Sequence, residues 1–199
     1  MADPREFWNH RYGLPGWAYG TEPNDFLREA APLLEGPVLC LGEGEGRNAV
    51  FLAQRGLDVT AIDLSPKALE KAQQLAAERG ARITTQEADL ADYDLGDQKW
   101  GAITSIWCQL PPWLRERVHH DVARALKPGG RFVLEAYTPA QLAFDTGGPK
   151  SLELLYEPKD LRTDLAALEF ERFSEQEREV QEGTWHRGRS AVVQVLARR

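Results

Sequence analysis

The sequence has few cysteines, no basic run and no long hydrophobic segment, and each absence narrows the range of functions. Only two of the 199 residues are cysteines. Cys40 and Cys108 both lie in apolar stretches, which is typical of buried thiols and of a reducing compartment. The net charge is -7 at pH 7, and no stretch is rich in Lys or Arg. Nucleic-acid binding is disfavoured, because phosphate binding needs clustered positive charge.

Patterns typical of targeting signals and membrane spans are also missing. No stretch approaches the roughly 18 consecutive apolar residues that a transmembrane helix needs. The first ten residues lack a positive flank followed by an apolar core. We therefore expect a cytoplasmic protein that has no membrane partner. We predict no metal site, and the sequence does not indicate an oligomeric state.

Short apolar runs alternate with helical patterns along the chain. Parallel strands are expected at residues 37–42, 58–63, 81–86, 100–107 and 131–137. Between them, helices are expected from about Arg47 to Arg55, from Pro66 to the stop at Gly80, and over residues 111–126. Such connections suit right-handed crossovers. Later alternating runs at 168–180 and 190–198 predict an antiparallel pair.

The predicted fold is α/β: a doubly wound, mostly parallel seven-stranded sheet with helices on both faces and an antiparallel strand at one edge. The length suits a single domain. We divide it into an N-terminal helical segment and possible lid (1–35), a ligand-binding core (36–137) and a C-terminal, substrate-side part (138–199). In such sheets ligands bind beyond the carboxyl ends of the strands.

A glycine-rich turn follows the first strand. Gly42, Gly44 and Gly46 stand at alternate positions, which lets a ligand approach a main chain that has no Cβ atoms. The dinucleotide-binding fingerprint spaces its third glycine differently, and Arg47 stands where that glycine would be. Glu43 and Glu45 would repel a pyrophosphate at the start of the next helix but tolerate a cationic group. We expect one of them to face the ligand and the other to face water.

Acidic residues after the next two strands extend this pattern to a nucleoside site. Asp63 lies about 20 residues beyond the first glycine, where a carboxylate accepts hydrogen bonds from both ribose hydroxyls. Asp89 is a candidate partner for an exocyclic amine such as adenine N6; the alternative is an acid that only solvates its loop. Leu64 and Leu90 would lie on the two faces of the base. S-adenosylmethionine has these parts: adenine, ribose and a cationic sulfonium tail.

Four segments in order resemble the successive motifs of the Rossmann-like (class I) S-adenosylmethionine-dependent methyltransferases: "VLCLGEGEGRN", "VTAIDLSP", "EADL" and "LKPGG". "GRN" and "WHRG" further resemble the tellurite-resistance and thiopurine-type small-molecule methyltransferases. The resemblance adds Asn48 to the cofactor-binding residues. It also implies that His186 and Arg187 border the substrate pocket. Cys40 departs from the family pattern, which often has an acidic residue at this position. Glu43 is therefore a more important candidate partner for the methionyl amine of the cofactor.

Aromatic residues provide two further candidates for contact with the cofactor. Tyr19 belongs to a dense aromatic group ahead of the first strand, and a lid over the sulfonium makes physical sense because aromatic faces attract cations. Packing of this segment on the core is the alternative. Trp107 ends the fourth strand, beside the expected position of the transferable methyl group.

The predicted function is methyl transfer from S-adenosylmethionine to a small molecule: a thiol, a chalcogen oxyanion such as tellurite or selenite, or another small acceptor. In-line transfer needs alignment more than a catalytic nucleophile. His186 is the candidate base and Arg187 a candidate anion-binding residue; a solvated turn is the alternative for both. Two other functions stay open: a non-catalytic cofactor-binding or regulatory protein, and a nicotinamide-dependent oxidoreductase, which Arg47 and the glutamates disfavour.

Overall fold

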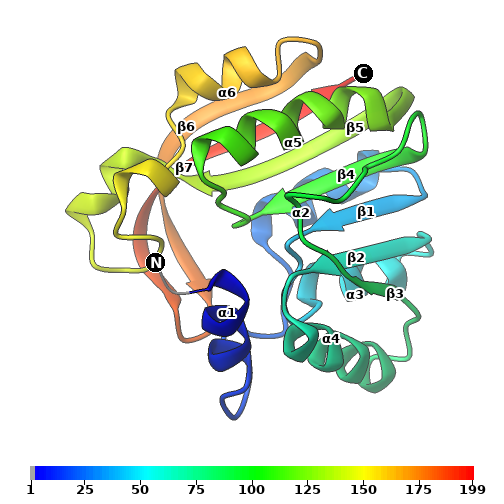
Figure 1. The fold of residues 1–199 in the computed structure, drawn as a ribbon, viewed down its shortest axis with the longest axis vertical. Helices are drawn as coiled ribbons and strands as arrows, with labels where there is room; N and C mark the ends of the chain where they lie inside the picture. The colour runs from blue at the N-terminus through cyan, green and yellow to red at the C-terminus, as the bar shows by residue number, and fades with distance from the viewer. Residues whose placement is uncertain (1–2) are drawn as a thin grey trace.

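A mixed seven-stranded sheet runs through the computed structural model, which describes residues 3–199 (Figure 1). Its strands are β1 (Val38–Leu41), β2 (Val59–Asp63), β3 (Thr84–Glu87), β4 (Trp100–Ile106), β5 (Leu126–Tyr137), β6 (Glu169–Glu182) and β7 (His186–Arg198). The order is β3-β2-β1-β4-β5-β7-β6. Pairs within β1 to β5 are parallel, whereas β7 is antiparallel to β5 and β6. The predicted fold class is confirmed.

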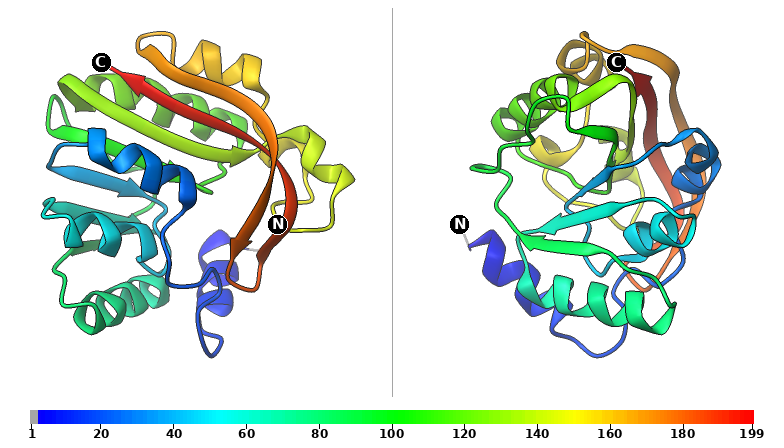
Figure 2. Two further views of the ribbon diagram at one scale, coloured as in Figure 1. Left: turned by 180° about the vertical axis from the view of Figure 1, so that it is seen from behind. Right: turned by 90° about the vertical axis from the view of Figure 1, so that its right-hand side faces the viewer.

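Helices cover both faces of this sheet (Figures 1 and 2). They are α1 (Pro4–Tyr12), α2 (Asp25–Ala30), α3 (Arg47–Gln54), α4 (Pro66–Glu78), α5 (Pro112–Ala125) and α6 (Pro158–Asp164), with short 3-10 turns at 31–33, 139–143 and 152–154. Apolar residues of α5 and α6 share one core with the sheet, and those of α2 and α3 share another. α1 lies apart from both layers, near the carboxyl ends of the strands. None of the helices in the described chain is both long and apolar enough to cross a lipid bilayer.

Local capping explains where the helices start. Asp3 caps α1 by accepting a hydrogen bond from the backbone N–H of Arg5, and Pro4 follows at the first helical position. Ser65 and Pro66 begin α4 in the same way. Asn24 caps α2 through the N–H of Leu27. These polar residues compete with the backbone elsewhere but satisfy free N–H groups at a helix start. The predicted start of α4 at Pro66 is confirmed.

The C-terminal hairpin is longer than predicted. β6 continues to Glu182 and β7 begins at His186, so that His186 and Arg187 belong to a strand and not to the late loop we expected. β5 likewise begins at Leu126, before the predicted start at residue 131, and so includes the "KPGG" segment. The hairpin bends around the sheet toward α1 (Figure 2). Its tip meets the N-terminal segment, where the N–H of Thr184 donates to the carbonyl of Ala18 at 3.0 Å.

Candidate active site

The glycine turn after β1 has a left-handed backbone that brings it against other elements. Gly42, Gly44 and Gly46 have φ values of 56, 67 and 88°. A Cβ atom at the first would lie 2.6 Å from Sγ of Cys108, and one at the second would lie 2.8 Å from the Tyr12 hydroxyl. A Cβ atom at Gly46 would lie 2.6 Å from Cβ of Ala72 in α4. The three glycines are therefore required both by backbone conformation and by the close approach of α1, α4 and the end of β4.

Glu43 points at the start of α3. Its Oε1 accepts hydrogen bonds from the backbone N–H groups of Asn48 at 2.9 Å and Ala49 at 2.8 Å. Gly46 has no side chain with which to cap the helix, so Glu43 replaces the missing cap. Burial raises the pKa of the Glu43 carboxyl to about 7, against the lowering effect of these N–H groups and of Arg47.

Glu45 is buried beneath the N-terminal segment, with 3% of its surface exposed. Its carboxylate accepts from the N–H of Ala18 at 2.8 Å and pairs with the ammonium of Lys71 at 2.9 Å. The expectation that one glutamate of the turn faces the ligand and the other faces water is therefore wrong for Glu45. The reason is that residues 17–19 fold over the turn and bury it.

Asp63 ties the end of β2 to the glycine turn. It is buried, and its two carboxylate oxygens accept from the N–H groups of Gly44 and Ser65, both at 2.8 Å. Burial raises the pKa of the Asp63 carboxyl, and these hydrogen bonds oppose the rise. A carboxylate has about four acceptor positions. Two are used here, so the arrangement leaves acceptor capacity for a pair of hydroxyl groups beside the turn.

The residues expected around an adenine lie after β2 and β3. Asp89 is exposed, and its Oδ1 accepts from the N–H of Ala91 at 2.8 Å, which makes it part of a tight turn. Leu90 is buried in the core beneath α5. Leu64 is partly exposed, and its carbonyl accepts from Arg5 of α1 at 3.1 Å. Only Asp89 and Leu64 therefore present surface to a ligand in this arrangement.

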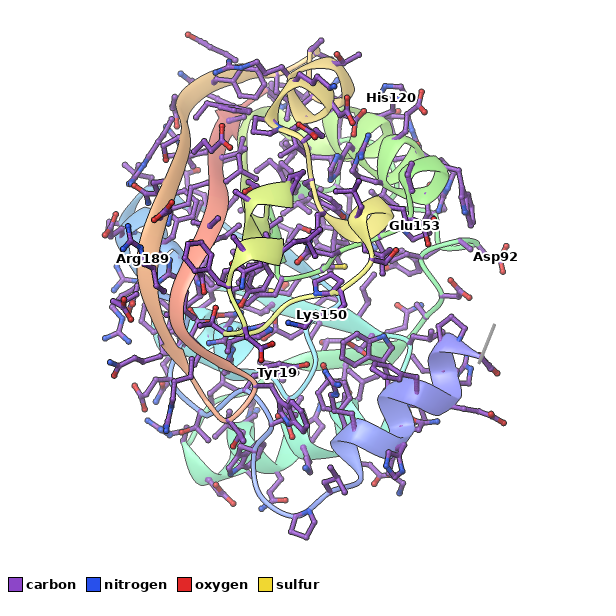
Figure 3. The ribbon with its side chains drawn as sticks, turned by 90° about the vertical axis from the view of Figure 1, so that its left-hand side faces the viewer. Tyr19, Asp92, His120, Lys150, Glu153 and Arg189 are labelled. Carbon is purple, nitrogen blue, oxygen red and sulfur yellow. The ribbon has the colours of Figure 1, made fainter. Side chains whose placement is uncertain are left out.

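An aromatic cluster lies at the carboxyl ends of β4 and β5. The rings of Trp107 and Tyr137 are stacked with centroids 4.3 Å apart. The imidazole of His186 lies 5.1 Å from the first ring and 5.4 Å from the second. Tyr19 completes the cluster at 4.5 Å from His186. In Figure 3 Tyr19 lies where the hairpin tip approaches α1, and Lys150 lies on the loop above it.

His186 is a neutral side chain in this cluster. Burial, followed by the charges of Arg47, Arg11 and Arg178, lowers its pKa to about 3 against the raising effect of Glu182. Its Nδ1 is buried and has no hydrogen-bond partner among residues 3–199. Arg187 is exposed, because successive side chains of a strand point to opposite faces. The structure therefore brings His186 to the candidate site and turns Arg187 away from it.

A buried ionic network, which the sequence analysis did not predict, lies beside the cluster. Glu182 accepts from Arg47 at 2.5 Å and from Nε1 of Trp107 at 2.6 Å. Glu135 accepts from Arg178 through both carboxylate oxygens, each at 2.8 Å. The available signal was a glutamate inside the otherwise apolar run "RFVLEAY" of β5. A charged residue in such a run indicates a buried partner of opposite charge.

Asn48 lies beside this ionic network, and its side chain is buried. Its Oδ1 accepts from the N–H of Asn24 at 2.9 Å, and the side chain is 3% exposed. Together with the pairing of Arg47, this means that the "GRN" segment holds the N-terminal segment and the hairpin. Among the described residues no group of three or more His, Cys, Asp or Glu side chains is placed to hold a metal ion.

A family model described as a methyltransferase domain matches residues 38–130. This part of the chain is similar to a methyltransferase domain. The matched region runs from β1 into β5 and so includes the glycine turn, Asp63 and Trp107. The aromatic partners Tyr137 and His186 lie beyond it.

Relatives of known name fall in the same class. A 2-heptyl-1-hydroxyquinolin-4(1H)-one methyltransferase from Mycobacteroides abscessus is 30% identical over 139 residues, which are 68% of this chain and 61% of that protein. A demethylmenaquinone methyltransferase from Tropheryma whipplei is 35% identical over 99 residues, which are 49% of this chain and 40% of that protein. The matched part of the chain thus spans between 40 and 61% of the length of these relatives.

Solved structures share the fold. The structure describing the conversion of a disulfide bond into a thioacetal group during echinomycin biosynthesis has a TM-score of 0.76 at 23% identity and covers 99% of this chain and 92% of that one. The structure of TehB from Haemophilus influenzae has a TM-score of 0.72 at 17% identity and covers 98% of this chain and 66% of that one. Magnesium protoporphyrin IX methyltransferase from Synechocystis, with bound SAH (S-adenosylhomocysteine), has a TM-score of 0.67 at 17% identity, and the match covers 96% of each chain. These likenesses show that the chain shares the fold of these proteins, and the family model adds a similarity to methyltransferase domains over residues 38–130.

Proposed function

We propose that this chain transfers a methyl group from S-adenosylmethionine to a small molecule. The observation that carries the proposal is the left-handed glycine turn, hydrogen-bonded to Asp63 and placed beside an aromatic cluster at the carboxyl ends of the strands. Ligands of doubly wound sheets bind at this edge. In this proposal residues 36–137 hold the cofactor, residues 138–199 form the acceptor side, and residues 1–35 cover the site.

The residues at this edge fit the parts of the cofactor. The backbone of the glycine turn permits close approach, Asp63 has acceptor capacity for the ribose hydroxyls, and Asp89 with Leu64 offers contacts to adenine. The rings of Tyr19 and Trp107 suit a neighbouring cation. When bound, S-adenosylmethionine supplies a methyl group on a positively charged sulfur.

Orientation and exclusion of water are the tasks left to the protein. Aligning two reactants contributes up to about 7 to 11 kcal/mol in ideal cases. A histidine whose pKa lies near 3 is a poor proton acceptor at neutral pH. We therefore assign His186 the role of orienting the acceptor through a hydrogen bond, in place of the general base expected from sequence. Arg187, exposed on the other face of β7, has no part in this mechanism.

The acceptor we propose is a small aromatic compound with a nucleophilic oxygen or sulfur. The partly exposed ring of Trp107, stacked on the buried ring of Tyr137, offers a flat apolar surface. The named acceptor of the Mycobacteroides abscessus relative, a hydroxyquinolinone, is of this kind. Thiols, tellurite and selenite belong in the same panel, because "GRN" and "WHRG" resemble the tellurite-resistance and thiopurine-type enzymes.

Calorimetry tests the cofactor and a panel of acceptors tests the reaction. We expect S-adenosylhomocysteine to bind and NAD not to bind. Asp63→Asn should weaken the binding of S-adenosylhomocysteine by about 10- to 100-fold, the loss typical of a hydrogen bond to a charged group. Asp58→Asn, at the exposed amino end of the same strand, is the matched control. Binding without turnover of any acceptor would show a non-catalytic protein, and binding of NAD alone would overturn the proposal.

A further inference from the structure

Glu182 occupies an unusual position, because four segments of the chain meet at its carboxylate. Oε2 accepts from Arg47, the first residue of α3, and from the indole of Trp107 at the end of β4. Oε1 accepts from Asn24 of the N-terminal segment at 2.9 Å and from Arg178 of β6 at 3.1 Å. One carboxylate thus connects the glycine turn, through its neighbour Arg47, to the aromatic cluster, through Trp107.

Trp107 depends on such partners for its position. Its φ is 58°, in the left-handed region that bulky residues rarely adopt. A residue is held in such a conformation only when its surroundings determine it. Two hydrogen bonds do so here: the backbone N–H donates to the carbonyl of Glu135 at 2.9 Å, and Nε1 donates to Glu182 at 2.6 Å. The second sets the plane of the indole that stacks on Tyr137.

Glu135 provides a natural comparison within the same network. Its carboxylate is also fully buried and also accepts from Asn24 and Arg178, with Gln194 as a further donor at 2.7 Å. Among the described residues its carboxylate forms no hydrogen bond with Trp107 or Arg47, and only its main-chain carbonyl, which Glu135→Asp retains, accepts from Trp107. The two glutamates therefore share the cost of burial and the ionic partners but differ in their link to the site.

We infer that Glu182 is a positioning residue: through Nε1–H of Trp107 and the guanidinium of Arg47, it fixes the aromatic wall of the acceptor side relative to the cofactor turn. This inference rests on the proposed function. Glu182 touches neither reactant. Its effect falls on the alignment of the acceptor with the methyl group, and hence on kcat, while the affinity for the cofactor stays the same because Asp63 and the glycine turn are not displaced.

A shorter side chain of the same charge at position 182 moves the carboxylate without changing the net charge of the network, so any effect on kcat reports the position of the carboxylate. Glu182→Asp withdraws the carboxylate by about 1.5 Å. Glu135→Asp makes the same change at the other carboxylate of the network. We expect the first to lower kcat about tenfold or more, since a displacement of 1 Å can cost that much. We expect the second to change kcat by less than about twofold. Both should leave the dissociation constant of S-adenosylhomocysteine within about twofold of the wild-type value.

Two further measurements show whether Glu182 acts through the indole. Trp107→Phe removes the N–H donor without changing any charge, and in this background Glu182→Asp should cause a smaller further loss of kcat, the part that acts through Arg47. Hydrogen exchange of the Trp107 indole proton, assigned in the NMR spectrum by its loss in Trp107→Phe, should be faster in Glu182→Asp and unchanged in Glu135→Asp. Should Glu182→Asp not fold, Trp107→Phe alone must show the loss of kcat.

Three outcomes would overturn the inference: equal losses of kcat in the two aspartate variants, a full effect of Glu182→Asp in the Trp107→Phe background, or an unchanged exchange rate of the indole proton. Each of these is recorded on a protein that binds S-adenosylhomocysteine and turns over an acceptor. A wild-type protein that fails to bind S-adenosylhomocysteine would instead contradict the proposed function.

Discussion

At the scale of single residues, Cys40 and Glu43 lie where this chain departs from the family pattern. The family resemblance leads to an acidic residue at position 40, where this chain has a buried thiol. Glu43 lies close enough to raise the pKa of the Cys40 thiol, after the larger effect of burial. The carboxylate that caps α3 belongs to Glu43, three residues after Cys40.

Glu43 should make stability fall as the pH rises. Its pKa in the folded protein is about 7, above the ordinary 4.5. The folded state thus binds the proton more tightly, and this contribution, fully present below pH 4.5, is lost as the pH rises through 7. In Glu43→Gln an uncharged oxygen accepts the same N–H groups. The free energy of unfolding in urea should then differ less between pH 5 and pH 8, by about 1–3 kcal/mol.

Glu35→Gln, which removes an exposed carboxylate just before β1, is the control for the loss of one negative charge. A Glu43→Gln variant with the wild-type dependence on pH would show that the Glu43 carboxyl titrates normally.

His186 should not appear in the pH dependence of the reaction. Its pKa near 3 keeps the imidazole neutral from pH 5 to 9, so kcat/KM should show no histidine ionisation there. His186→Gln retains a hydrogen-bonding group and should lower kcat by about tenfold or less, against the hundredfold or more expected on losing a general base. A variant that lost an acidic limb present in the wild-type profile would restore His186 as the base.

At the scale of elements, α1 and the residues that follow it are attached to α4 and to the glycine turn by a few contacts. Ser65 donates to Oδ1 of Asn9 at 2.6 Å, Lys71 reaches the carbonyl of Leu14 at 2.9 Å, and Tyr12 lies over Gly44. Arg11 also extends over the exposed ring of Trp185 at the hairpin tip, 4.6 Å from its centroid. Contacts of this kind hold a segment that can open, because few apolar side chains are buried beneath it.

Cofactor binding should therefore protect α1. In hydrogen exchange with S-adenosylhomocysteine present, amides of residues 4–20 should exchange more slowly than in the free protein. Those of α5, beneath the opposite face of the sheet, should keep their rates and serve as the internal control. Equal rates in residues 4–20 with and without the ligand would show that this segment does not cover the cofactor.

Elements with a local signal were predictable, and those that depend on distant partners were not. Apolar runs and caps such as Ser65 with Pro66 located the strands and helix starts. The position of Asp63 at the end of β2, beside the glycine turn, was predictable because it follows from topology alone. The side chain of Asn48, by contrast, is buried and accepts from the backbone N–H of Asn24. No pattern local to "GRN" reveals that distant contact.

At the scale of the whole molecule, the buried ionic network connects both ends of the chain to the middle of the sheet. Asn24 comes from the start of the chain, Glu135 from β5, and Arg178 with Glu182 from β6. Such networks are weak evidence for stability, because the cost of desolvation offsets the attraction between charges. Because the residues of this network belong to several elements, a change in their ionisation affects the stability of the entire fold.

Acid should therefore unfold the protein in a window that these residues set. The pKa of Glu182 is lowered to about 2 from 4.5, so its contribution is present above pH 4.5 and is lost as the pH falls through 2. His186, lowered from 6.5 to about 3, acts in the same direction between those values. The contribution of His186 to the free energy of unfolding in urea should fall by on the order of 3 kcal/mol between pH 6.5 and 4. The raised pKa of Glu43 acts in the opposite direction, so the fall is read from the difference between the wild type and His186→Gln. His186→Gln should reduce this fall, and an unchanged slope would contradict it.

The tip of the β6–β7 hairpin has a consequence for protein engineering. A Cβ atom at Gly183 would lie 2.4 Å from the backbone nitrogen of Gly20. Two main chains far apart in sequence thus meet there without room for a methyl group. An epitope inserted at position 183 would separate the first twenty residues from the rest, although hairpin tips usually accept insertions. The same epitope between Asp97 and Gln98, in an exposed turn, should be harmless.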